Sequence, residues 1–300
     1  MSVLDDEALR VKLHAKSRAA LLAKIATGVS AAAGVVFLAA GLWPVGVVFL
    51  LAAVACVVVN VYASRDMKRL VSDNVVAQAL GEVFDVELYV PDRYIGAETL
   101  RQARLIHNWN RSSGSDTVYG RYRGVTFVFS DVHLEDEETS TDSDGNTNTT
   151  TTTRFRGQWL MLEAKKALPH MVRLRERAQR RLTGSYKKTK SDVETENAAF
   201  NEKFEILTDD PHTAFYVLTP HFMEAIIAAD ERANARTYLC FDGQRVHIAV
   251  DNGRDSFEVK RGADVKDIDR LRARIKGEIR YIMEIVDELL QNTYLFGKEN

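Results

Sequence analysis

A stretch of 40 residues without one charged side chain, Ile25–Ser64, constrains this chain more than any other feature. A helix needs about 20 residues to cross the roughly 30 Å hydrocarbon core of a bilayer, so the stretch is long enough to cross twice. Near its centre, Pro44 disfavours helix at the residue before it, and the ring of Trp43 suits the headgroup region. The pattern therefore predicts two transmembrane helices, at about Ile25–Leu42 and Val45–Tyr62, joined by a tight turn.

Basic residues flank this hairpin on both sides and predict its orientation. They are Arg10, Lys12, Lys16, Arg18 and Lys24 before the hairpin and Arg65, Lys68 and Arg69 after it. Because positively charged flanks stay on the cytoplasmic side, we expect a multi-pass protein of the plasma (inner) membrane with both termini in the cytoplasm. The predicted organisation is a basic helix at 1–24, the transmembrane hairpin at 25–63 and a cytoplasmic α+β domain at 64–300.

The composition of the hairpin bears on its packing and its role. The apolar segment is too long and begins too late for a cleaved signal peptide. Its first half carries the small residues Gly28, Ser30, Ala31, Ala32 and Gly34. Small residues let helices approach closely, either within the hairpin or between copies in a homo-oligomer. No ionisable residue lies at membrane depth, which argues against a proton or ion path through the hairpin.

Strand patterns follow the hairpin. Residues 118–129 are rich in aromatic and β-branched side chains at period two, which predicts paired strands. The second strand is predicted to continue to about Thr141 and to return as Thr147–Leu162. Asp144-Gly145 predicts the turn between them. The tip, 140–153, is nearly all polar and is predicted to be solvated and mobile.

The remaining elements define the fold class. Strands are expected at 170–175, 204–207, 214–218, 236–241, 244–250 and 256–260, and helices at 65–84, 97–107, 220–231 and 263–292. Strands and helices do not alternate as in βαβ units. We therefore expect an α+β fold: an N-terminal transmembrane helical hairpin, a mainly antiparallel sheet and a long C-terminal helix. The apolar stripe of the last helix covers barely three heptads, so packing on the sheet is favoured over a coiled coil.

Several segments resemble a bacterial family known as the domain of unknown function 3137. They are Tyr122–Val132, Phe155–Gly157, Phe200–Ile206, Leu218–Pro220 and Met223. The resemblance would cover most of residues 64–292, and it implies a paired membrane helix before the domain. It implies no chemistry, because the family has no established activity. Members are often encoded beside LemA-type membrane proteins, so the resemblance also implies such a protein as a possible partner.

Catalytic and cofactor-binding motifs are absent from the sequence. It contains no Gly-x-Ser-x-Gly, P-loop, dinucleotide fingerprint or His-Glu-x-x-His, so no catalytic residue and no cofactor is expected. A divalent metal could be held by two carboxylates and two imidazoles, those of Asp209, Asp210, His212 and His221. The same residues suit a turn followed by the first turn of a helix. Both interpretations stay open.

Charge is distributed unevenly along the predicted domain. Between residues 165 and 190, one acid, Glu176, accompanies ten cations: Lys165, Lys166, Arg173, Arg175, Arg177, Arg180, Arg181, Lys187, Lys188 and Lys190. An acidic run precedes them: Asp131, Glu135, Asp136, Glu137, Glu138, Asp142 and Asp144. The two runs could pair with each other or be solvated. Alternatively, the basic segment could face the anionic inner leaflet, where each cation near the surface gains about 1 kcal/mol.

These features favour a membrane-anchored interaction or scaffold module that binds a protein partner or copies of itself. One alternative is a membrane-bound, metal-dependent hydrolase that uses the Asp–His cluster. Another is an accessory subunit of a membrane transporter. Nucleic acid is not expected as a partner, because no platform of stacking aromatic residues accompanies the basic segment.

Overall fold

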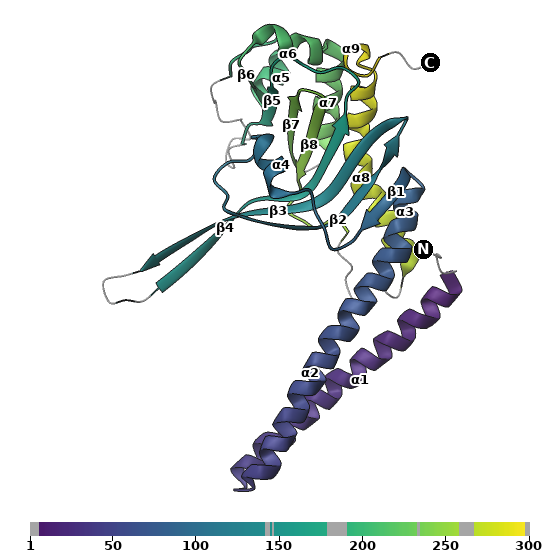
Figure 1. Cartoon of the computed structure of the whole chain (residues 1–300), viewed down its shortest axis with the longest axis vertical. Helices are drawn as coiled ribbons and strands as arrows, with labels where there is room; N and C mark the ends of the chain where they lie inside the picture. The colour runs from purple at the N-terminus through teal and green to yellow at the C-terminus, as the bar shows by residue number, and fades with distance from the viewer. Residues whose placement is uncertain are drawn as a thin grey trace. The chain divides into compact units, whose positions relative to one another are not determined.

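A computed structural model presents the chain as two compact units. Unit 1 comprises residues 1–79 and 259–273, and unit 2 comprises residues 80–258 and 274–300. The residues that the structure describes are 6–141, 145, 147–178, 191–232, 235–257 and 267–297. Figure 1 labels the helices and strands of both units.

Unit 1 contains a hairpin of two long helices, α1 (Asp6–Ala39) and α2 (Trp43–Val71). The connection is short, and Gly41 there adopts a φ of 79°, which glycine tolerates without a Cβ clash. Further along the hairpin, the rings of Phe37 and Phe49 stack with centroids 5.5 Å apart. The prediction of two helices joined by a tight turn is confirmed, and the first helix continues back to Asp6.

Two glycines allow α1 and α2 to approach closely. A Cβ added at Gly34 would lie 3.0 Å from the side chain of Leu50, and one added at Gly46 would lie 2.6 Å from Leu38. A Cβ added at Gly28, by contrast, would meet nothing within 4 Å. Of these predicted small residues, Gly34 therefore serves the intramolecular contact and Gly28 does not.

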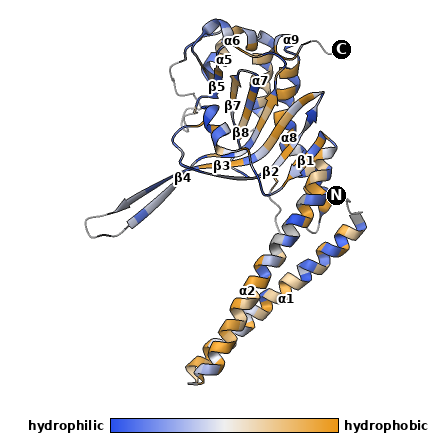
Figure 2. Cartoon of the chain, in the orientation of Figure 1, coloured by the Kyte–Doolittle hydropathy of each residue, from blue (hydrophilic) through white to orange (hydrophobic). Residues whose placement is uncertain are grey.

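Both helices are long and apolar enough to cross a membrane, over Glu7–Ala39 and Trp43–Ala63. Their apolar side chains face outward: Val29 and Leu51 are each 64% exposed. Figure 2 shows this apolar character as orange along the lower part of the hairpin. A core helix of a soluble protein would bury such residues.

The helical path continues beyond α2, as predicted. A single π-turn, η1 (Ser72–Val76), leads into α3 (Ala77–Gly81). A strand that was not predicted, β1 (Asp85–Val90), follows. Its burial does not alternate strictly, which explains why period-two reasoning missed it.

Unit 2 is organised by one antiparallel sheet of eight strands, in the order β1-β2-β3-β4-β8-β7-β5-β6. Its longest strands are β2 (Arg111–Tyr122), β3 (Val125–Thr141) and β4 (Thr147–Glu163). Arg123 and Gly124, with φ values of 47° and 76°, form the turn between β2 and β3. Two successive positive φ values match the right-handed twist of a hairpin.

The other strands complete the sheet. They are β5 (Val172–Glu176), β6 (Phe204–Thr208), β7 (Arg236–Asp242) and β8 (Arg245–Asp251). The hairpin of β7 and β8 is confirmed as predicted, with Asp242 opposite Arg245. The fold class is α+β, with two apolar N-terminal helices, an antiparallel sheet and a long C-terminal helix.

Different segments cover the two faces of the sheet. One face packs against residues 94–109, which include α4 (Ala97–Gln102), and its core contains Leu100, Phe155 and Trp159. We call it the α4 face. The opposite, α8 face packs against α7 (Pro220–Arg232) and α8 (Ile268–Leu290).

Side-chain contacts identify the α8 face. Gln158 Nε2 on β4 donates a hydrogen bond to the carbonyl of Glu278 on α8, at 3.2 Å. The part of the predicted stripe of α8 that lies in unit 2 is buried: Ile275, Ile279, Ile282, Ile285 and Leu289. Packing of the C-terminal helix on the sheet is therefore confirmed.

One predicted strand is wrong. Residues 214–218 were expected to be extended, but they belong to or follow α6 (Pro211–Val217). Asp210 caps this helix through its side chain, and Pro211 occupies a first-turn position where its fixed φ favours helix. The apolar run Ala-Phe-Tyr-Val-Leu is compatible with either a strand or a helix, and the helix cap at Asp210 favours the helix.

Smaller differences concern element ends. The helix expected at 97–107 ends at Gln102, and the break expected at 112–114 lies inside β2. Ser256 and Phe257 form a turn rather than the start of a strand, and 258–260 lie outside the described residues. Two short helices were not predicted, α5 (Ala198–Lys203) and α9 (Thr293–Phe296).

Candidate functional site

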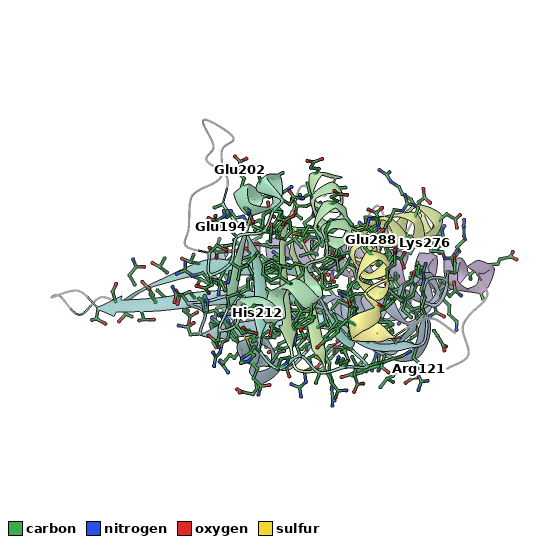
Figure 3. The ribbon with its side chains drawn as sticks, turned by 90° about the horizontal axis from the view of Figure 1, so that it is seen from above. Arg121, Glu194, Glu202, His212, Lys276 and Glu288 are labelled. Carbon is green, nitrogen blue, oxygen red and sulfur yellow. The ribbon has the colours of Figure 1, made fainter. Side chains whose placement is uncertain are left out.

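The four residues proposed from sequence as metal ligands are not brought together as a ligand set. Asp210 accepts hydrogen bonds from the backbone of Thr213, at 3.0 Å, and from its hydroxyl, at 2.7 Å. The bond from the Thr213 hydroxyl is the largest influence that lowers the pKa of Asp210. His221 lies on α7 and pairs with Glu288 of α8 at 2.9 Å. Figure 3 labels His212 and Glu288.

Another group of carboxylates does lie close together. Ligand atoms of Asp116, Asp131 and Asp255 lie within 4.8 Å of one another. Asp131 accepts from the backbone N–H groups of Ser256 and Phe257, both at 3.3 Å. Burial, and then the neighbouring carboxylates, raise the pKa of Asp131 well above its ordinary value. A protonated Asp131 relieves the repulsion within the group without any added cation.

The described part of the predicted basic segment divides into two parts. Lys165 and Lys166 are exposed, and Lys166 Nζ lies 3.7 Å from the ring centroid of Tyr294. Arg173, Arg175 and Arg177 are only partly exposed on or beside β5. The other five cations lie outside the described residues: Arg180, Arg181, Lys187, Lys188 and Lys190.

Two arginines of β5 converge with the loop after α4. Arg173 Nη1 and Arg175 Nη2 both donate to the carbonyl of Arg104, at 3.3 and 2.9 Å. Arg175 Nη2 also contacts Nε2 of His107. In a neutral imidazole that nitrogen accepts the bond, and the ring proton then sits on Nδ1. We call Arg104, His107, Arg173 and Arg175 the arginine cluster.

The loop that supplies this carbonyl is held in an unusual conformation. Arg104 and Asn108 have φ values of 50° and 56°. Non-glycine residues seldom occupy this region, which costs on the order of 1 kcal/mol or more. The shared hydrogen bonds to Arg104 offset that cost, and they place the loop over β5.

The arginine cluster has an excess of positive charge. Its acidic neighbours are Glu205 and Asp242. Glu205 lies 3.8 Å from Arg175. The charges of Asp242, Arg104 and Arg173 all influence the pKa of the buried Cys240 thiol. Arg245 lies opposite Asp242 on the paired strand. Arg245 also lies opposite Glu163 on β4. Among the described residues named here, four guanidinium groups therefore accompany three carboxylates, which leaves an excess of one positive charge.

Titration and hydrogen bonding reflect the same excess. Burial, and then Arg175 and Arg173, lower the pKa of His107, so its imidazole is neutral at pH 7. The Nε–H groups of Arg173 and Arg175 are buried and find no acceptor in the described part of the chain. The cluster therefore has more hydrogen-bond donors than acceptors, whereas a cation site needs acceptor atoms as ligands.

A second charged cluster lies on the α8 face. Lys203 Nζ pairs with Asp230, and their side chains are only 8% and 4% exposed. Thr237 donates from its hydroxyl to Asp230 at 3.0 Å and from its backbone N–H to Glu176 at 3.0 Å. The hydroxyl of Tyr281 contacts that of Thr237. We call these five residues the lysine–carboxylate network.

The network is internally compensated. Burial, and then the charge of Asp230, raise the pKa of Glu176 to about 8. At pH 7 Glu176 is therefore protonated and hydrogen-bonds the Asp230 carboxylate. Burial also raises the pKa of Tyr281. One cation and one anion remain, and they are in contact.

The outer part of the β3–β4 hairpin is exposed at residues 138–141 and 147–153. Figure 1 shows it projecting beyond the rest of the sheet, and Figure 3 shows the same from above. The pairing of β3 with β2 ends at Glu135, and that of β4 with β8 begins at Gly157. We call residues 136–141 and 147–153 the arm. In the described part of the chain, the strands of the arm pair only with each other.

The root of the arm is fixed by ion pairs and by one asparagine. Arg154 pairs with Asp136 at 2.6 Å, and Arg111 pairs with Glu137. Asn110 bonds both backbone groups of Glu137, at 2.8 and 2.9 Å. The two acids at the root are therefore partnered, but by arginines outside the basic segment at 165–190, so these pairs do not join the two charged runs.

Asn110 also reveals which backbone groups point outward. The N–H and C=O of Glu137 face Asn110 and so point away from β4. Because orientation alternates along a strand, Thr139 and Thr141 also point outward, as do Thr149 and Thr151 on the partner strand. Beyond Glu137, the outward main-chain donors and acceptors of the arm have no strand partner among the described residues.

Comparison with known proteins places part of the chain in a family. The family model described as "Protein of unknown function (DUF3137)" matches residues 153–291. This segment belongs to the DUF3137 family. Among curated proteins, none matches the chain in sequence.

One solved structure resembles the chain, that of the mycobacterial trehalose monomycolate transport factor A, TtfA. It is 14% identical, with a TM-score of 0.37, over 73% of this chain and 93% of that chain. Both the identity and the TM-score are too low to carry an argument about fold or function.

The DUF3137 segment contains one charged cluster entirely and the other in part. All five residues of the lysine–carboxylate network lie within 153–291, as do Arg173 and Arg175. Arg104 and His107 precede the segment, and sequence patterns gave no signal for either. The signal for Arg173 and Arg175 was their period-two spacing, which places both side chains on one face of a strand.

Proposed function

We propose that this protein is a membrane-anchored interaction module whose arm binds an extended segment of a partner protein as an additional strand. The observation that carries the proposal is the pair of open edges on the arm. An edge strand is a ready template for another strand. In such complexes main-chain hydrogen bonds supply the affinity.

The composition of the arm supports this use. Natural proteins usually protect edge strands with lysine, proline or inward-pointing charges. Residues 139–141 and 147–153 contain no lysine, no proline and no charge, and they are mostly threonine. Threonine favours the extended conformation. The arm is therefore preformed for pairing, and its polar side chains, pale to blue in Figure 2, keep it soluble when unbound.

The hairpin of unit 1 supplies the proposed anchor. Its exposed apolar side chains suit a lipid environment, and basic residues flank it on both sides. We propose that both termini, and hence the arm, lie in the cytoplasm at the inner membrane. A reporter fused after residue 300 should be active only in the cytoplasm; activity outside the cell would contradict this orientation.

The test of the arm removes its outward N–H groups while keeping the β3–β4 ladder. In the full-length chain, Thr139→Pro with Thr151→Pro deletes one outward donor from each edge, where proline is tolerated. The matched control is Thr139→Ala with Thr151→Ala, which keeps both donors. Proteins that co-purify from gently solubilised membranes are identified for each variant.

The expected result is a partner that the wild type and the alanine control retain and the proline variant loses. A LemA-type protein and a second, differently tagged copy of this chain are the first partners to score. Identical partners for all three proteins would reject the arm as the binding element. Unchanged thermal unfolding of the proline variant would show that the rest of unit 2 is intact.

A further inference from the structure

We propose that a cleft on the α4 face binds a small zwitterion with an apolar side chain, that is, a free α-amino acid or a short peptide. The cleft has a volume of about 460 Å³. It is lined by residues at the ends of the neighbouring strands β3, β4, β8 and β7, among them Thr126, Val128, Met161, Glu163, Asp242 and Arg245. None of these residues belongs to the arm, so the proposal is independent of the proposed function.

Strand register gives the cleft an apolar floor. Val128 packs against the core of the α4 face, and Met161 lies opposite Val128 on the paired strand. The same row continues to Tyr119 on β2 and Leu88 on β1, whose side chains are 38% and 53% exposed. Strands lie about 4.8 Å apart, so the row extends roughly 14 Å across the sheet. An aliphatic or aromatic side chain of a ligand would be stabilised by burial against this row.

Two opposite charges border the apolar floor. Side chains two residues apart on a strand share a face, so Glu163 stands beside Met161 on the α4 face. Arg245 lies directly opposite Glu163 on β8. The two side chains nevertheless form no ion pair in the described part of the chain, because Arg245 Nη1 donates to Oε1 of Gln102, at 3.2 Å. Both charged groups therefore remain available to a ligand in the cleft.

The presence of both signs in one cleft identifies the class of ligand. A purely cationic ligand would face the guanidinium of Arg245, and a purely anionic ligand would face the carboxylate of Glu163. A zwitterion can place its ammonium group against Glu163 and its carboxylate against Arg245, whose planar fork matches two carboxylate oxygens. Asp242 lies opposite Arg245 on β7 and offers a second acceptor for the ammonium group. The apolar side chain of the ligand then covers Val128 and Met161.

A free amino acid and a short peptide present the same two charged groups, and a cleft of about 460 Å³ is within the size range of small-molecule sites. The experiment therefore uses L-leucine and L-leucyl-L-leucine as probes. For each probe, an N-acetylated analogue lacks the ammonium group, an amidated analogue lacks the carboxylate, and the glycine analogue lacks the apolar side chain. Binding to the full-length chain is measured by saturation-transfer NMR titration in lipid nanodiscs, because free detergent tails would compete for an apolar surface.

At least one of the two zwitterions should bind the wild-type protein. Removal of its ammonium group, its carboxylate or its apolar side chain should each raise the Kd by about tenfold or more, because each group has its own partner in the cleft.

Two variants test the residues, each with a matched control. Glu163→Gln and Arg245→Gln should each raise the Kd for the zwitterion by about tenfold or more. Glu202→Gln removes an exposed carboxylate on α5, labelled in Figure 3. Arg254→Gln removes an exposed guanidinium that pairs with Glu278 at 3.4 Å. Both controls should leave the Kd within about twofold of the wild-type value, because exposed charges contribute little to the fold.

A gain of affinity protects the test against loss of fold. Glu163→Lys places a second cation beside Arg245, so it should bind the N-acetylated probe at least about threefold more tightly than the wild type does. Binding of leucine would assign a free amino acid as the ligand, and binding of leucyl-leucine alone would assign a short peptide. The proposal is overturned if neither zwitterion binds or if the analogues bind as tightly as the zwitterions. It is also overturned if Glu163→Gln and Arg245→Gln behave like their controls, or if Glu163→Lys gains no affinity for the N-acetylated probe.

Discussion

The two faces of strand β5 handle charge in opposite ways. Toward the α8 face, Glu176 joins Lys203 and Asp230 in a network where each charge has an opposite partner. Toward the α4 face, Arg173 and Arg175 converge on one carbonyl with like-charged neighbours. The same five-residue strand therefore carries one cluster of paired charges and one in which like charges converge.

The difference separates charges on which stability depends from charges whose loss is tolerated. A buried ion pair is costly to break, because the remaining charge stays in a medium that solvates it poorly. Like charges that remain partly exposed persist more cheaply, since water and salt screen them. The network should therefore control stability, whereas the arginine cluster should tolerate the loss of one of its charges.

The largest expected effect is that of Lys203→Met in the full-length protein in detergent. The substitution leaves Asp230 buried without its cation and should lower the free energy of unfolding by about 3 to 5 kcal/mol. Urea unfolding followed by circular dichroism measures it.

An exposed ion pair provides the control for this variant. Lys276 pairs with Glu82, and their side chains are 37% and 51% exposed. Lys276→Met should therefore cost less than about 1 kcal/mol. Equal losses from the two substitutions would show that the buried ion pair contributes no more to stability than the exposed one.

A smaller effect, with a defined pH dependence, is expected for Glu176→Gln. Glutamine can accept from Thr237 and donate to Asp230, as protonated Glu176 does. The folded-state pKa of Glu176 is raised, so its stabilising contribution is complete below about pH 4.5 and is lost as pH rises through about 8. The variant should therefore gain stability relative to wild type over that range.

The size of this gain is limited by partial exposure of the side chain. We expect a plateau of about 1 to 3 kcal/mol above pH 8, and no gain at pH 4. Unfolding at several pH values measures the difference. A gain that is constant from pH 4 to pH 9 would assign the effect to packing instead of proton binding.

Sequence reasoning predicted those elements that local periodicity specifies. The charge-free stretch gave the two apolar helices, and alternation gave the β2–β3 and β7–β8 hairpins. It failed at residues 214–218, where an apolar run suits both strand and helix and the cap at Asp210 decides. It also missed β1, whose burial does not alternate strictly and so gives no period-two signal.

The charged clusters were beyond local reasoning because their members meet only in the folded sheet. Thr237 and Glu176 are 61 residues apart in sequence, and Arg175 and Arg104 are 71 residues apart. No short motif records such pairs. The basic segment was recognised as unusual, but the convergence of Arg173 and Arg175 on the Arg104 carbonyl depends on strand register, which composition does not specify.

The smallest expected effect on stability is that of Arg173→Gln, and it is the sharpest test of the contrast within β5. Two unit charges about 5 Å apart repel by about 3 kcal/mol at an effective dielectric constant of 20. Removing one relieves that repulsion and also loses one hydrogen bond and some packing of the arginine stem. These contributions oppose each other, so the free energy of unfolding should change by less than about 1 kcal/mol.

Salt then distinguishes the wild type from this variant. Raising sodium chloride from 20 to 500 mM screens the repulsion in the wild type, so its stability should rise more than that of Arg173→Gln. Urea unfolding at both salt concentrations gives the comparison. A loss of 3 kcal/mol or more at low salt would mean that Arg173 is structural, as Lys203 is, and that the two faces of β5 do not differ in role.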